Sequence, residues 1–229
     1  MNAPTPFPDD TLAPPDNPAE AAGGMVARLH ARLHEMLLTH EIPLGTPLSE
    51  RQLSLRLGVS RTPLREALRR LEGEGLIQRH NGVLEVRRIT LEEFLELLKI
   101  RRLLEVEAAG AAAGHISDAT LDDLRARLAA LLHADTPDNH ARVLLDIELH
   151  RAVCEACGNR SMAELIEQLR RKSMLFATPP APRHFPQVVA EHLALLDALA
   201  TGEPEPARAT MAQHLDNVLD NILSRLLRR

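Results

Sequence analysis

The hydrophobic positions of residues 48–76 form two short helical stripes separated by a tight turn. Leu53 and Leu57 mark the first stripe. The second recurs at the 3.6-residue spacing of a helix and comprises Leu64, Ala67, Leu68 and Leu71. Gly58 suits the end of the first helix, where a positive φ is easiest for glycine, and Ser60 suits the N-cap of the second. The pattern predicts a helix–turn–helix.

The polar side of the second helix is basic, because Arg61, Arg65 and Arg69 project from it. A helix–turn–helix that reads DNA needs such an N-terminal end, which enters the major groove. The alternative is a hairpin of two helices with a solvated basic face. We favour DNA reading, because the turn residues and the arginine positions agree over the whole stretch.

Charge is distributed unevenly along the chain, whose net charge is −5. Residues 25–88 hold 11 Arg and 7 Glu, a balance of +4. Residues 1–24 hold four acids and no base, and residues 89–229 hold 16 bases and 21 acids. Only the segment around the helix–turn–helix is basic, as an electrostatic footprint for phosphates requires.

Flanking patterns complete an N-terminal domain over residues 25–88. A helix is expected over residues 25–40, and residues 76–88 read as a β-hairpin in which Asn81-Gly82 suits a type I′ turn. This hairpin would be the wing of a winged helix. Residues 1–24 contain six prolines and no apolar period, which predicts a disordered tail.

The remainder, residues 89–229, is helical in pattern. We expect helices near 91–114, 118–133, 137–157, 160–177, 185–201 and 204–228, which together would form an antiparallel bundle of about six helices. The fold is therefore expected to be mainly α. The sequence contains no run of 18 apolar residues, so no membrane helix is predicted. Neither a signal peptide nor a disulfide framework is evident, which fits the cytoplasm.

Four side chains of the predicted bundle could share a metal ion. Asp146 and His150 are four residues apart and so lie on one helix face. His192 lies 11 residues before Glu203 in the last turn and His214 lies 11 after it, which places both at similar heights in an antiparallel hairpin. Three imidazoles and a carboxylate suit Zn, our first choice, or Ni, Fe or Mn. The alternative is a set of core histidines satisfied by hydrogen bonds.

Arg101 is the other candidate in the bundle, because it falls within an apolar stripe. The stripe consists of Phe94, Leu97, Leu98, Leu104 and Ala108. A buried arginine needs a partner. It could form a salt bridge with an acid such as Glu105, or clamp the carboxylate of an effector through bidentate hydrogen bonds.

Residues 58–77 resemble the winged-helix domain of GntR-family bacterial transcription regulators. Their sequence is Gly-Val-Ser-Arg-Thr-Pro-Leu-Arg-Glu-Ala-Leu-Arg-Arg-Leu-Glu-Gly-Glu-Gly-Leu-Ile. The resemblance covers roughly residues 25–88. The second half resembles the FCD-type ligand-binding domain of the FadR branch through Asp146-x-x-x-His150, Glu191-His192 and His214.

The resemblance implies roles for individual residues. Metal-binding FCD domains use an Asp and three His in these four slots, and Arg101 begins the Arg-x-x-x-Glu pattern of the first FCD helix. The expected DNA contacts are Arg51, Ser60, Arg61, Thr62, Arg65, Arg69, Asn81 and Gly82. The wing tip is short and apolar after Gly82, which departs from wings that enter the minor groove.

These observations predict a homodimeric regulator, a repressor rather than an enzyme. It would bind a palindromic operator and sense a small organic acid through a metal-containing helical domain. Two alternatives remain. One is a dedicated metal sensor without an organic effector. The other is a metal-dependent hydrolase. The position of Glu191 argues against it, because this carboxylate lies about 100° around the helix from His192 and so is not placed beside the histidines as a general base.

Overall fold

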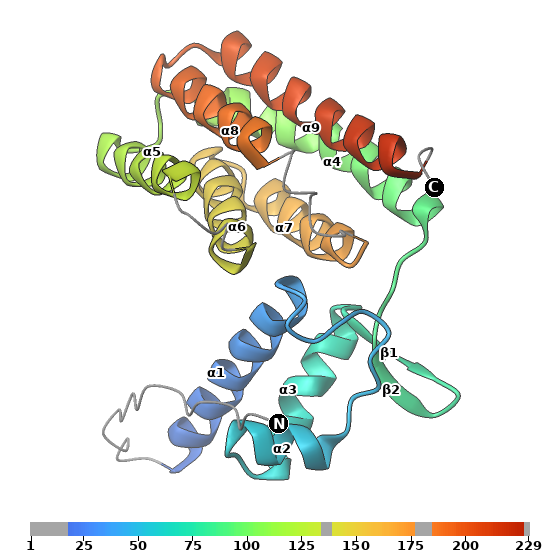
Figure 1. Ribbon diagram of the computed structural model, residues 1–229. Coiled ribbons are helices and arrows are strands. Elements are labelled where there is room, and N and C mark those ends of the chain that lie inside the picture. The colour runs from blue at the N-terminus through green and yellow to red at the C-terminus, as the bar shows by residue number, and fades with distance from the viewer. Residues whose placement is uncertain (1–17, 134–138, 177–184, 227–229) are drawn as a thin grey trace.

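The computed structural model describes residues 18–133, 139–176 and 185–226, which form a small N-terminal unit and a helical bundle (Figure 1). The N-terminal unit contains α1 (Pro18–Leu38), α2 (Glu50–Leu57), α3 (Arg61–Gly73), β1 (Ile77–His80) and β2 (Val83–Val86). Helix α1 packs against α3, and their shared core includes the fully buried Leu33, Leu64 and Leu71. The predicted winged helix–turn–helix is confirmed.

Local chemistry explains the turns of this unit. Gly58 has a φ of 66° and ends α2, where its N–H donates to the carbonyl of Ser54. Ser60 occupies the N-cap of α3 in an extended conformation, although its side chain makes no capping hydrogen bond. Asn81 and Gly82 have φ values of 49° and 80°, so both turn residues of the hairpin adopt the left-handed conformation that a type I′ turn requires.

Helix α1 starts earlier than predicted. It begins at Pro18, so residues 18–24 are helical and do not belong to a disordered tail. Proline is tolerated at the first position of a helix, and the Ala-Glu-Ala-Ala segment that follows favours helix formation. The remainder of the predicted tail, residues 1–17, lies outside the described residues.

Within the described residues, six helices build the bundle, as predicted: α4 (Leu91–Ala112), α5 (Asp118–His133), α6 (Asn139–Ala156), α7 (Arg160–Met174), α8 (Phe185–Ala200) and α9 (Pro204–Leu226). Helix α4 is central, since it contacts α6, α7 and α9, while α8 forms an antiparallel hairpin with α9 (Figure 1). Helix α7 ends at Met174, three residues before the predicted end. In the described part of the chain, no helix is long and apolar enough to cross a membrane.

The C-terminal end of α1 meets the bundle beside α6 and α7 (Figure 1). The His40 ring, just after α1, lies 3.0 Å from the carbonyl oxygen of Met174 at the end of α7. Nε2 of His140 in α6 lies 3.0 Å from Oε1 of Glu35 in α1. The two units therefore touch through side chains as well as through the link between β2 and α4.

Candidate functional site

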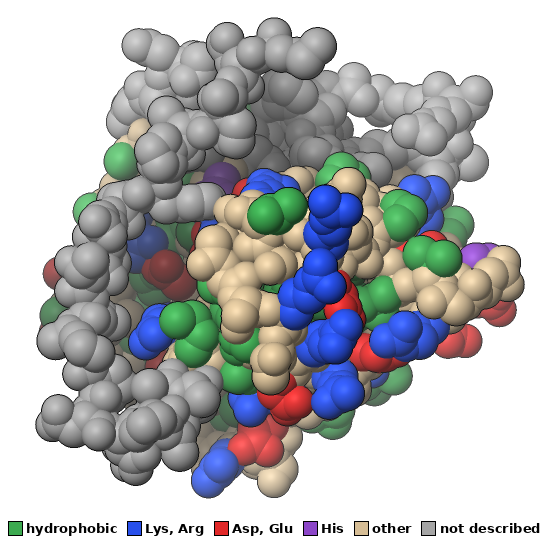
Figure 2. Space-filling model, turned by 90° about the horizontal axis from the view of Figure 1, so that it is seen from below, with side chains coloured by type: hydrophobic (Ala, Val, Ile, Leu, Met, Phe, Trp, Pro, Cys, Tyr) green, Lys and Arg blue, Asp and Glu red, His purple; other side chains and the backbone are tan. Residues whose placement is uncertain are grey.

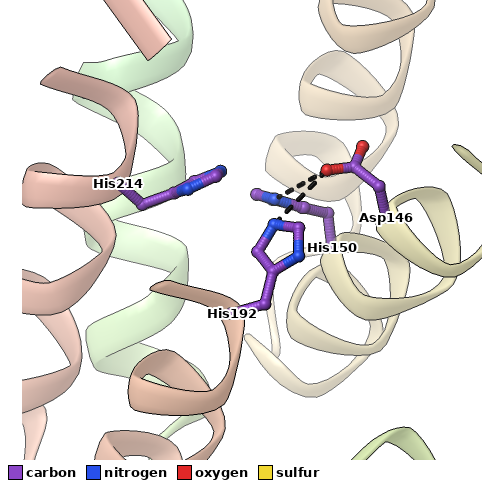
Figure 3. A group of neighbouring side chains, drawn as sticks. All are labelled: Asp146, His150, His192 and His214. Carbon is purple, nitrogen blue, oxygen red and sulfur yellow. Dashed lines mark ion pairs between the residues drawn. The ribbon is translucent and has the colours of Figure 1, made fainter. Parts of the chain in front are cut away.

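Asp146, His150, His192 and His214 come together inside the bundle, from α6, α8 and α9 (Figure 3). One ligand atom from each lies within 4.8 Å of the others. The three histidines are 1–4% exposed. They are carried inward because each shares its helix face with buried apolar residues, namely Leu149, Val153, Val189, Leu196, Met211 and Leu215.

Two imidazole nitrogens that face this cluster, Nε2 of His150 and Nε2 of His192, lack hydrogen-bond partners among the described residues. Oδ1 of Asp146 lies 3.4 Å from Nε2 of His192 and 4.0 Å from Nε2 of His150. Among the described residues, neither of these two nitrogens has a hydrogen-bond partner, although both are buried. A buried polar atom without a partner costs about 1–3 kcal/mol, so such atoms require an explanation. A metal ion would supply the missing interaction for both.

Two carboxylates outside the cluster orient its histidine rings. Nδ1 of His214 donates to Oε2 of Glu191 at 3.0 Å, which leaves its Nε2 lone pair directed away from Glu191. Nδ1 of His150 lies 2.7 Å from Oε2 of Glu105. Carboxylates behind ligating histidines commonly fix the ring orientation in metal sites. This role of Glu191 depends on α9 and was missed in the sequence.

The protonation states of the cluster suit a cation. Burial lowers the pKa of His150 to about 3 and also lowers the pKa of His192, so both rings are neutral at neutral pH. Burial alone would raise the pKa of Asp146. The adjacent Arg170 and histidines outweigh burial and hold it well below its usual value. Neutral imidazoles and an ionised carboxylate are the forms that bind metals.

The donor set therefore fits a divalent transition metal. Metal–ligand bonds of about 2.0–2.2 Å in tetrahedral geometry place the donor atoms about 3.3 Å apart. The observed separations, from 3.4 Å between Asp146 and His192 to at most 4.8 Å in the group, need only small side-chain movements to reach that value. Nitrogen and oxygen donors without sulfur suit Zn, Ni, Fe or Mn.

A buried ion network lies directly behind the cluster. Arg101 donates from Nε to Glu105 Oε1 at 2.7 Å and from Nη1 to Ser173 Oγ at 2.8 Å. Arg170 donates from Nη1 to Glu105 Oε2 at 3.1 Å and from Nη2 to Asp146 Oδ2 at 2.7 Å. The salt bridge between Arg101 and Glu105, one of the two alternatives that the sequence offered for this arginine, is thus present.

Arg170 was missed in the sequence, although a signal for it exists. It lies in the buried stripe of α7 with Ile166, Leu169 and Ser173, just as Arg101 lies in the stripe of α4. Burial alone would lower the pKa of Arg170, but Glu105 and Asp146 raise it, so the guanidinium stays charged. Arg170 therefore links a predicted metal ligand to the ion network.

The predicted DNA contacts lie on the surface of the N-terminal unit. Arg51, Ser60, Arg61, Thr62, Arg65, Arg69, Asn81 and Gly82 are all exposed. Seen from below, arginine side chains form a band across this face (Figure 2). Arg65 is 56% exposed and forms an ion pair with Glu50 of α2 at 2.7 Å, so its side chain is held beside the first helix of the motif.

Comparison with known proteins decides the family. Residues 26–83 match the bacterial regulatory proteins of the gntR family, and residues 96–217 match the FCD domain. The chain belongs to the GntR family of regulators that carry an FCD domain. It is thus a transcription regulator by family, as its sequence motifs indicated.

Individual relatives of this GntR-family chain are distant but similar in length. It is 29% identical to a protein of Paenarthrobacter nicotinovorans named "Probable D-xylose utilization operon transcriptional repressor", over 76% of this chain and 78% of that protein. It is 27% identical to "HTH-type transcriptional repressor RspR" of Escherichia coli K12, over 78% and 80%. The structure of E. coli McbR/YncC has the same fold, with a TM-score of 0.74, 21% identity and coverage of 88% and 98%.

Proposed function

We propose that this GntR-family regulator is a homodimeric repressor that senses a small organic acid through a divalent transition metal. The metal ligands would be Asp146, His150, His192 and His214. The observation that carries this proposal is the convergence of three buried histidines and the half-buried Asp146, with unpartnered Nε2 atoms on two of the histidines. The names of two relatives as transcriptional repressors support the direction of regulation. Its place of action would be the cytoplasm.

The chain's own residues would divide the work of the metal centre. Glu191 orients His214, and Glu105 lies against His150, so the rings keep their Nε2 atoms toward the centre. Arg170 holds the second oxygen of Asp146. The metal, when bound, would supply a Lewis-acidic centre for the oxygens of a hydroxy- or dicarboxylate. Metal titrations of operator binding, with and without organic acids, would separate this sensor from a regulator that responds to metal alone.

A hydrolase is less well supported than a sensor. A metal-activated water needs a nearby general base. Glu191 accepts hydrogen bonds from His214 and Asn217, and Glu105 is paired with Arg101 and Arg170. The carboxylates that contact the histidines from outside the cluster are thus committed to orienting rings and balancing charge.

DNA reading by α3 predicts a clear effect of Arg65→Ala. An arginine near the start of a recognition helix reaches base edges, so its loss should weaken operator binding by about 1–3 kcal/mol and relax sequence preference. Anisotropy titration on a DNA fragment selected by the wild type from a random pool would measure this. Arg160→Ala on the bundle removes an arginine that is 92% exposed and should leave affinity unchanged. Equal affinities of the Arg65 variant and the wild type would contradict the assignment.

Arg101 remains a proposed effector contact. A guanidinium has five N–H donors, and the hydrogen bonds to Glu105 and Ser173 use two of them. Arg101→Lys keeps the charge opposite Glu105 but loses the planar fork. We expect the variant to keep DNA binding and metal content while losing most of the 5- to 150-fold response to acid typical of such coupling, about 1–3 kcal/mol.

The response of Arg101→Lys would be measured as operator affinity across a panel of hydroxy- and dicarboxylic acids. The matched control is Arg102→Lys, at the next position, where the side chain is exposed and pairs with Asp216. If both variants respond to the same acid at the same concentration as the wild type, Arg101 serves only the ion network.

A further inference from the structure

A cavity of about 230 Å³ lies where the N-terminal unit meets the bundle. Helix α1 contributes His34 and Leu38 to its lining, α6 contributes Ile147, and α7 contributes Arg171 and Met174. We refer to it as the junction cavity. His150 and Arg170 also line it, whereas Asp146, His192 and His214 do not. It therefore lies on the far side of His150 and Arg170 from most of the candidate metal ligands.

The lining of the junction cavity combines apolar and cationic side chains. Leu38 of α1 is 3% exposed and lines the cavity. Among the described residues, three arginines and one acid, Glu167, line the cavity, and two of the arginines pair with acids outside it. Arg171 holds Glu167 at a long 3.4 Å, and both side chains are partly exposed.

His34 adds a neutral polar group to the junction cavity. Burial, together with Arg171 and His30, lowers its pKa to about 4, so the ring is uncharged at neutral pH. The cavity thus places the partly exposed guanidinium of Arg171 beside apolar side chains, whereas Arg170 is already paired with Glu105 and Asp146. Ligand sites of this kind are mostly apolar, with a few polar groups that fix orientation.

We propose that the junction cavity is a second ligand site, which takes a small monocarboxylate with an apolar body. Arg171 would bind the carboxylate in place of its weak pair with Glu167, because guanidinium–carboxylate bonds are charge-assisted. Leu38, Ile147 and Met174 would bury the apolar body. The volume is below the roughly 300–1,000 Å³ of sites for drug-sized ligands, which limits the ligand to a small molecule.

Helix α1 lines this site, which connects ligand binding there to DNA binding. The same helix packs against α3, the helix expected to read DNA. A ligand in the junction cavity touches both units, so its affinity depends on how they are arranged. By linkage, the ligand then favours the arrangement that binds it better. This site does not require the metal centre.

The test uses the full-length protein with benzoate and hexanoate as probes, and benzamide and hexanamide as neutral counterparts. Binding is measured by calorimetry in the presence of EDTA, so that metal-bound carboxylate makes no contribution. We expect at least one acid to bind, and its amide to bind at least tenfold more weakly. No binding of either acid, or equal binding of acid and amide, would overturn the proposal.

Two substitutions locate the binding. Arg171→Gln removes the proposed carboxylate partner and should weaken acid binding at least fivefold. Leu38→Trp should fill the cavity and abolish binding, and Leu38 lies outside the core cluster that holds the N-terminal unit together. Arg160→Gln, on the same helix but outside this cavity, is the matched control and should bind as the wild type does. Wild-type affinity in both cavity variants would show that the acid binds elsewhere.

Discussion

Replacing Glu105 with alanine is expected to lower the free energy of unfolding by about 3–5 kcal/mol. Glu105 is 2% exposed and its two oxygens pair with Arg101 and Arg170. Burial alone would raise its pKa, but Arg101, Arg170 and His150 hold it well below the usual range, so the group is a carboxylate. Its removal leaves two buried guanidinium groups without their shared counter-charge, which is the costly way to break a buried ion pair.

Urea denaturation followed by circular dichroism would measure the change. The control is Glu107→Ala, two residues further along α4, where the side chain is exposed and pairs with Arg208 at 3.4 Å. An exposed pair of this kind contributes about 0–1 kcal/mol. If both substitutions had equally small effects, the ion network would be neither buried nor coupled as the structure indicates.

Loss of metal binding in His192→Ala is the second large effect that we expect. We expect the wild type to bind about one divalent transition metal per chain, and the variant to lose a quarter of the donor set from the centre of the bundle. A ligand that binds only the folded state stabilises it by about 2.7 kcal/mol at a free concentration of 100 times Kd. The wild type should therefore melt at a higher temperature with Zn²⁺ than with EDTA, and the variant should not.

Elemental analysis and differential scanning fluorimetry, on protein stripped and then reconstituted, would test this. His115→Ala is the control, since His115 is exposed and its ring contacts the carbonyl of Ala113 near the end of α4. If the wild type contains no stoichiometric metal, the four residues form only a polar cluster. A His192 variant with the wild-type metal content would place the ion elsewhere.

Local signals in the sequence accounted for most of the fold. Glycine and asparagine at the turns and the 3.6-residue stripes fix short-range geometry, so the hairpin at Asn81-Gly82 and the six bundle helices were predicted. The early start of α1 was not predicted, because the prolines of the N-terminal segment indicated a disordered tail. Helix propensity in the residues after Pro18 outweighs them.

The candidate site was partly predictable for a different reason. Equal distances from the last turn place His192 and His214 side by side, which follows from antiparallel helix geometry. The pairing of Arg170 with Asp146, and the orientation of His214 by Glu191, depend on how α7 and α9 pack. No spacing within one helix specifies such contacts. The junction cavity likewise arises from residues of α1 that meet α6 and α7 only in the folded chain.

The buried network has a consequence for electroneutrality. Arg101 and Arg170 balance Glu105 and Asp146, and the neutral rings of His150 and His192 add nothing to the sum. A divalent ion bound by Asp146 would bring two positive charges into surroundings that are already balanced. Glu191, which is only partly buried, offsets at most one of them. An organic anion arriving beside the ion would restore neutrality, so metal and acid should each bind more tightly in the presence of the other.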